Sequence, residues 1–113
     1  MSLPHPISPD LAELVARRFR LLAEPMRILL LERLRGGEAT VGELASELDT
    51  SQQNVSKHLA ALADAGILGR RKDGNRVFYE IADEGVFALC EQVCGSLHEQ
   101  LRALNELVEG VRS

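Results

Sequence analysis

The stretch "TSQQNVSKHLAALADAG", from Thr50 to Gly66, decides the interpretation of this chain. It starts with small polar residues, continues with Val, Leu and Ala at helical spacing and ends at a glycine, so it predicts an amphipathic helix. Its first two turns carry mainly short amide and hydroxyl groups. These groups both donate and accept hydrogen bonds, as base edges in the DNA major groove require. The candidate base-contacting residues are Ser51, Gln52, Gln53, Asn54, Ser56, Lys57 and His58.

A second, shorter helix is predicted just upstream, in "VGELASELD" from Val41 to Asp49. Thr40 with Glu43 has the pattern of a capping box at its start, and Thr50 with Gln53 repeats that pattern before the next helix. Two helices joined by so tight a turn predict a helix-turn-helix over residues 40–66. On the second helix the apolar residues Val55, Leu59 and Leu62 share a face that would hold it to the domain.

A β-hairpin is predicted to follow, over residues 67–82. The segment "ILGRRKDGNRVFYEI" has apolar residues on either side of Asp73-Gly74-Asn75, and Asp-Gly between such runs is a strong hairpin signal. A basic hairpin beside a DNA-reading helix suits contact with phosphates or with the minor groove. The candidate contacts in this hairpin are Arg70, Arg71, Lys72, Asn75 and Arg76.

Helices are also predicted on both sides of this central region. Ser8 and Pro9 begin a first helix over residues 8–24, after an N-terminal arm at residues 1–8. Pro25 begins another, and Asp83 caps a long last helix over residues 83–110 with apolar residues every three or four positions. The fold class is therefore mainly α with a small β-hairpin, in a single domain spanning residues 1–113.

The distribution of charge supports a nucleic-acid partner although the net charge is −4. Residues 51–79 carry five basic and two acidic side chains, a local charge of +3, and local charge governs the binding of a polyanion. No apolar run is long enough to cross a membrane, and no signal peptide is recognisable. Two cysteines in one late segment do not make a disulfide framework, so a cytoplasmic location is expected.

With these features the chain resembles the ArsR/SmtB family of small winged helix-turn-helix repressors. The resemblance rests on "LAEPMRILLLERL", "VGELASELDTSQQNVSKHLAALADAGIL" and "RRKDGNRVFYEI", and it extends over roughly residues 12–110. It implies a homodimer built from the first and last helices, acting as a transcriptional repressor on palindromic double-stranded DNA. The apolar seam of the last helix favours this dimer over a monomer that buries the seam against its own first helix.

The resemblance also implies two metal sites, and both lack ligands here. Thr40 and Gly42 stand where one site has sulfur ligands. Alignment to the second site gives Asp83, Gly85, Ser96 and Glu99, without the two histidines. Since zinc prefers nitrogen and sulfur ligands, zinc sensing through either site is not expected.

Cys90 and Cys94 remain as candidate sensing residues, because they are four positions apart on one helix. Three interpretations stay open. The thiols could be small apolar residues in the seam, they could be modified by oxidants or reactive sulfur, or they could bind a thiophilic metal or metalloid. Apart from a thiophilic ion at Cys90 and Cys94, the sequence predicts no metal site and no cofactor.

Two other function classes compete with a DNA-binding repressor. A winged helix used only for docking another protein is the alternative, and the basic hairpin argues against it. An enzyme is not expected, because the sequence has no nucleophile–base pairing, phosphate loop or paired carboxylates in a plausible cleft.

Overall fold

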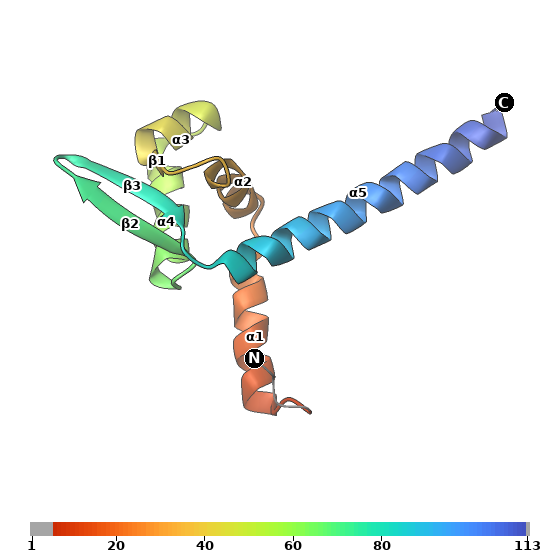
Figure 1. Ribbon diagram of the computed structural model, residues 1–113, viewed down its shortest axis with the longest axis horizontal. Coiled ribbons are helices and arrows are strands. Elements are labelled where there is room, and N and C mark those ends of the chain that lie inside the picture. The colour runs from red at the N-terminus through yellow and green to blue at the C-terminus, as the bar shows by residue number, and fades with distance from the viewer. Residues whose placement is uncertain (1–5, 113) are drawn as a thin grey trace. The chain divides into compact units, whose positions relative to one another are not determined.

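The computed structural model describes residues 6–112, with side chains through residue 110 (Figure 1). The chain divides into two compact units, residues 1–82 and 83–113. Most of the predicted N-terminal arm, residues 1–5 of its eight, lies outside the described residues.

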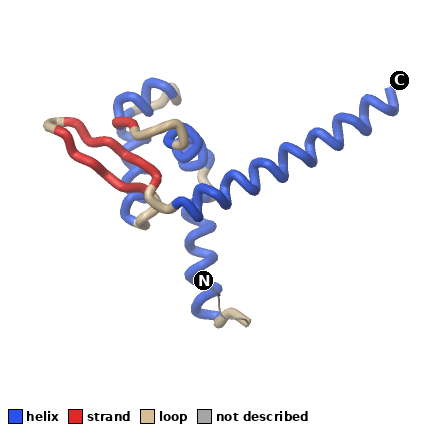
Figure 2. Tube along the Cα trace, in the orientation of Figure 1, coloured by secondary structure: helices blue, strands red, loops and turns tan. Residues whose placement is uncertain are grey.

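Between residues 6 and 82, the described part of the first unit, there are four helices and a small sheet (Figure 2). The elements are α1 (Pro9–Leu22), α2 (Pro25–Leu34), β1 (Ala39–Thr40), α3 (Val41–Glu47), α4 (Gln52–Asp64), β2 (Leu68–Asp73) and β3 (Arg76–Ile81). The strands are antiparallel in the order β1-β3-β2. The mainly helical fold with a β-hairpin is thereby confirmed. Strand β1, which adds to the predicted hairpin of β2 and β3, was not predicted.

Helix starts agree with the local signals in the sequence. The Ser8 hydroxyl accepts a hydrogen bond from the Leu11 amide, and Pro9 occupies the first helical position of α1. Thr40 caps α3 by accepting from the Glu43 amide, and its own hydroxyl donates to the Glu43 carboxylate. These bonds satisfy amides that the helix itself leaves unpaired.

The turn between α3 and α4 differs from prediction by one residue. Ser51, not Thr50, is the N-cap of α4, and its hydroxyl accepts from the Asn54 amide. The Thr50 amide donates to the Ala45 carbonyl, so Thr50 belongs to the C-terminal end of α3. Asp49 takes the left-handed conformation that this helix end needs, at φ 53°. Asp is one of the few residues with a side chain that tolerate it.

The hairpin tip is a two-residue loop, Gly74-Asn75, because Asp73 pairs with Arg76 across the strands. Of these two loop residues only Gly74 has positive φ, at 63°, which matches a hairpin turn with glycine first. Figure 1 shows the tip projecting away from the helices of its unit.

The core of the first unit is formed mainly by leucines. Its fully buried large side chains are Leu30, Leu31, Leu44, Val55, Leu59, Leu62 and Ile67. Three of them, Val55, Leu59 and Leu62, belong to α4, so α4 is held along one face as predicted.

The second unit is a single helix, α5 (Glu84–Arg112). The Asp83 carboxylate accepts from the Val86 amide, which confirms Asp83 as the cap. No helix within residues 6–112 is long and apolar enough to cross a membrane.

Candidate nucleic-acid interface

Helix α4 presents a polar face opposite its buried one. Gln52, Gln53, Ser56 and Lys57 are all exposed, and helical spacing places them side by side. Their amides, hydroxyl and ammonium can together serve base acceptors, base donors and phosphates. Four of the seven residues predicted for this helix therefore form one continuous polar surface.

Two further predicted residues take part in capping the helix. The Ser51 oxygen accepts from the backbone of Asn54, and the Asn54 amide donates to the Thr50 hydroxyl at 3.1 Å. Each keeps some hydrogen-bonding capacity, because the Ser51 hydroxyl proton and the Asn54 carbonyl oxygen are not used in these bonds. They lie at the N-terminal edge of the α4 surface.

His58 is not at this surface, so its placement among the DNA-facing residues was wrong. Its side chain is only 5% exposed, and its Nδ1 accepts a hydrogen bond from Nε of Arg27 on α2 at 3.0 Å. The same Arg27 donates to the Leu21 carbonyl. His58 thus joins α4 to α2 and to the end of α1.

This buried contact makes stability depend on pH. Burial, followed by the nearby cations of Arg27 and Lys57, lowers the pKa of His58 below its usual 6.5, and Glu24 acts weakly in the opposite direction. The unfolded chain then binds more protons than the native state as the pH falls below about 6.5. We expect the His58 contribution to be complete above pH 7 and to decline from there down to its native pKa.

Urea unfolding between pH 5 and pH 8 tests this expectation. The variant His58→Asn keeps a hydrogen-bond acceptor near Nδ1 but does not titrate, so it should lose this part of the pH dependence. His98→Asn, at an exposed position on α5, is the matched control. An unchanged pH profile in the His58 variant would contradict the assignment.

The strand register divides the basic residues of the hairpin between two faces. Arg70 lies opposite the buried Tyr79, and its guanidinium is 3.7 Å from the Asp64 carboxylate of α4. Arg71 lies opposite Phe78, which is itself opposite Thr40 of β1, so these three side chains share the other face of the sheet.

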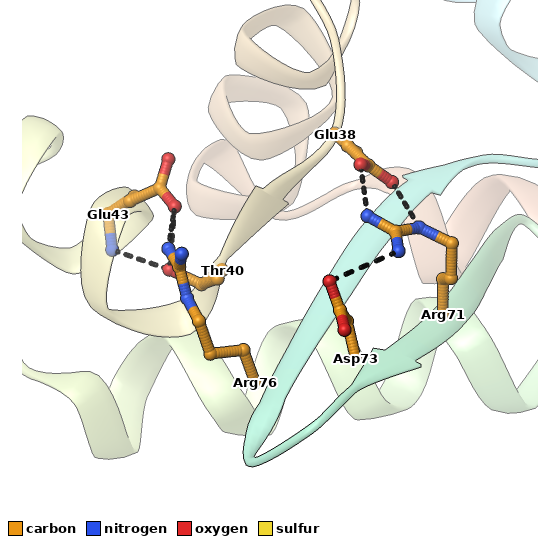
Figure 3. Close-up of polar contacts among 6 residues, drawn as sticks. All are labelled: Glu38, Thr40, Glu43, Arg71, Asp73 and Arg76. Carbon is orange, nitrogen blue, oxygen red and sulfur yellow. Dashed lines mark hydrogen bonds and ion pairs between the residues drawn. The ribbon is translucent and has the colours of Figure 1, made fainter.

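On that second face, carboxylates hold two arginines (Figure 3). Arg71 donates through Nε and Nη2 to the two oxygens of Glu38, at 3.1 Å and 2.5 Å. Its Nη1 also lies 4.0 Å from Asp73. Arg76 donates to Glu43 at 3.0 Å. The hydrogen bond from Arg71 lowers the pKa of Glu38, so this carboxylate is charged at neutral pH.

The Phe78 ring supports both guanidinium groups. The Cζ atoms of Arg71 and Arg76 lie 4.6 Å and 4.9 Å from its centroid, within the range of a cation–π contact. Lys57 and Lys72, by contrast, form no ion pair with any residue in the described part of the chain. Lys72 is therefore the one unpaired cation among the predicted contacts of the hairpin.

The two cysteines lie on α5 as free thiols. Cys90 is half-buried and Cys94 is exposed, and burial raises the pKa of Cys90. A raised pKa keeps the thiol protonated and less reactive. Within the described residues no three His, Cys, Asp or Glu side chains are grouped closely enough to hold a metal ion. In the described part of a single chain, Cys90 and Cys94 therefore do not belong to a cluster of three such ligands.

Both helices predicted to form a dimer carry uncovered apolar side chains. On α1 these are Leu14, Val15 and Phe19, and on α5 they are Val93, Leu97, Leu101, Leu104, Leu107 and Val108. Apolar stripes of this length are unusual on a monomer and typical of a subunit interface.

Comparison with known proteins identifies the family. The family described as "Helix-turn-helix domain" matches residues 22–71. A biofilm growth-associated repressor of Agrobacterium fabrum is 36% identical over 89 residues, which is 79% of this chain and 76% of the relative. A transcriptional repressor SmtB homolog of Synechocystis is 33% identical over 85% of this chain and 73% of its own. The chain belongs to the ArsR/SmtB family.

Solved structures of similar proteins agree with the fold. The antimony-specific transcriptional repressor AntR has a TM-score of 0.79 and 31% identity, over 90% of this chain and 93% of its own. A homodimeric winged helix-turn-helix DNA-binding domain from Mycobacterium bovis has a TM-score of 0.75 and 31% identity, over 89% and 94%. Helices α3 and α4, together with the β2–β3 hairpin as the wing, accordingly have the architecture of a winged helix-turn-helix. As a member of the ArsR/SmtB family, the protein is a transcriptional regulator and not an enzyme.

Proposed function

We propose that this ArsR/SmtB-family protein is a homodimeric repressor that binds a palindromic operator through the recognition helix α4 of each protomer. The observation that carries the proposal is the continuous exposed face of Gln52, Gln53, Ser56 and Lys57 on a helix whose other face is buried. A fixed helix with donors and acceptors on its outer face suits a major groove. Two such helices would enter successive grooves about 34 Å apart.

In this proposal the remaining contacts serve the DNA backbone. Ser51 and Asn54, at the start of α4, lie where a helix N-terminus approaches a phosphate. The wing supplies Arg70, Arg71, Lys72, Asn75 and Arg76 to phosphates or to the minor groove. The homodimeric neighbour and the uncovered apolar stripes of α1 and α5 support the dimer. As a DNA-binding regulator, the protein would act in the cytoplasm.

Fluorescence anisotropy tests the assigned surface. Using a labelled duplex from the region upstream of the gene at about 0.1 M salt, Gln53→Ala should cost about 1–3 kcal/mol on the preferred sequence and relax the choice among sequences. Lys72→Ala, at the exposed cation of the wing that is unpaired among the described residues, should weaken all duplexes similarly and reduce the salt dependence. Gln92→Ala, exposed on α5, is the control.

Both possible failures are informative. If the Gln53 and Lys72 variants bind like the wild type, the assigned surface is wrong. If the wild type leaves the anisotropy of any duplex unchanged even at low salt, the alternative of a protein-docking winged helix is supported instead.

We further propose that Cys90 and Cys94 are the point at which a thiophilic metal, a metalloid or an oxidant acts on the dimer. They are free thiols one helical turn apart in the apolar seam of α5, and a dimer would bring four of them to one interface. The antimony-specific relative supports a thiophilic signal. A ligand that changed the packing of this seam could change the spacing of the two recognition helices.

Titration of the DNA complex tests this second proposal. Arsenite, cadmium and a polysulfide are added separately to fully reduced protein, with Cys90→Ser/Cys94→Ser in parallel. Release of DNA by one compound that the double variant ignores is the expected result. If DNA stays tightly bound in the presence of all three compounds, both cysteines only pack in the seam.

A further inference from the structure

The cations of the wing are matched by carboxylates of the same unit. Arg70 is close to Asp64, Arg71 is held by Glu38 and lies near Asp73, and Arg76 is held by Glu43. Only Lys72 is left without a partner among the described residues. Before DNA is bound, the wing therefore presents much less free positive charge than its sequence indicates.

The two pairs on the Phe78 face differ from incidental surface contacts in their geometry. Glu38 engages Arg71 through both oxygens (Figure 3). The Phe78 ring also lies against the Arg71 and Arg76 guanidinium groups. Glu43 is itself fixed by the Thr40 hydroxyl at the start of α3. Glu38 directly precedes β1, and Glu43 lies in the first turn of α3. Each is 33 residues away from its arginine in sequence.

We propose that Glu38 and Glu43 are positioning residues that keep Arg71 and Arg76 from DNA phosphates until the recognition helix has docked on its preferred sequence. This inference rests on the proposed DNA-binding function. In a non-specific complex the two pairs stay closed, and Arg71 and Arg76 contribute little to binding. In the specific complex the seated helix α4 brings phosphates against the wing, and each arginine exchanges a carboxylate for a phosphate.

The energetics allow this exchange. All four side chains are substantially exposed, from 36% for Glu38 to 63% for Arg76, so each pair is screened by water and weak. A duplex offers a dense row of phosphates and gains further from the release of counterions. The carboxylates can thus keep the two arginines from brief contacts with phosphates. A correctly positioned DNA backbone can still displace the carboxylates.

The consequence is greater discrimination between operator and bulk DNA. The affinity for random sequence comes almost entirely from neutralised phosphates, so holding back two arginines lowers it directly. The specific complex is affected less, because its phosphates are aligned by base contacts. What matters in a genome is the ratio of these affinities.

The test measures binding of the full-length chain to a random-sequence duplex over a series of salt concentrations. The variant Glu38→Gln/Glu43→Gln removes both charges, and glutamine still suits the third position of a helical capping box. We expect roughly fivefold tighter binding near 0.1 M salt, since two weak pairs are removed. The plot of log Kd against log salt should steepen by roughly 1.8, which corresponds to two more phosphate contacts.

Two further variants separate the carboxylate hold from simple repulsion. Glu99→Gln/Glu106→Gln makes the same change in charge and releases Arg102 on α5, and it should not steepen the salt plot. Adding Arg71→Gln/Arg76→Gln to the Glu38/Glu43 variant should abolish its gain. A gain that persists without these arginines would mean that the carboxylates only repel DNA, and it would overturn the proposal.

The remaining outcomes distinguish this inference from the function on which it rests. If Arg71→Gln/Arg76→Gln alone weakens operator binding but the Glu38/Glu43 variant binds random DNA like the wild type, the carboxylate hold is absent although the protein binds DNA. If no variant and no wild-type protein binds any duplex, the proposed function itself fails. Thermal unfolding of each variant shows whether the fold is intact.

Discussion

Replacement of Leu101 by Glu is expected to convert the dimer into monomers and to weaken operator binding by at least about 100-fold, because a monomer loses the advantage of two linked recognition helices. Leu101 is 61% exposed in the single chain and lies in the apolar stripe of α5. In a dimer seam a carboxylate at this position would be buried without a partner, which is strongly unfavourable. The helix itself should tolerate the change, since Glu is a good helix former.

Light scattering coupled to size-exclusion chromatography measures the mass, and anisotropy measures the affinity. Gln92→Glu is the matched control, because it adds the same charge on a different face of the same helix and should leave both measurements unchanged. A Leu101→Glu protein that remains dimeric would show that the stripe of α5 is not the interface.

Leu59→Ala has the largest effect that we expect on stability, a loss of about 2–5 kcal/mol in the free energy of unfolding. Leu59 is fully buried on the inner face of α4. The substitution removes three carbon atoms from a closely packed core and leaves a cavity that only partly collapses. Because this core holds the recognition helix, the loss bears on function as well as on folding.

Urea unfolding followed by circular dichroism measures the loss. Gln52→Ala is the control on the same helix: its side chain is exposed, so stability should stay within about 0.5 kcal/mol. If Leu59→Ala costs no more than this control, Leu59 does not anchor α4 as the structure places it.

The sequence was sufficient wherever the controlling interaction spans a few residues. The caps at Ser8, Thr40 and Asp83 each bond to an amide three positions ahead, so the pattern of residues carries the whole signal. The same holds for the buried face of α4 and for the hairpin, whose periodicities and turn residues are local.

Predictions failed in two situations. In one, two neighbouring residues were equally suitable for the same role, and in the other, an element formed only because a segment distant in sequence pairs with it. Thr50 and Ser51 both qualify as a cap, and only the bond from the Thr50 amide to the end of α3 selects Ser51. Strand β1 is only two residues long and forms because β3 pairs with it. Nothing in the local sequence could indicate either result.

By itself, the sequence determined the order of the elements, the polar face of α4, the basic wing and the apolar seam of the last helix, since these depend on spacing along the chain. Tertiary structure alone decided which polar groups are available. His58 turns inward to Arg27 of α2, and Arg71 and Arg76 meet Glu38 and Glu43 from 33 residues away. The physical reason is that burial and charge pairing are set by neighbours in space, and folding chooses those neighbours.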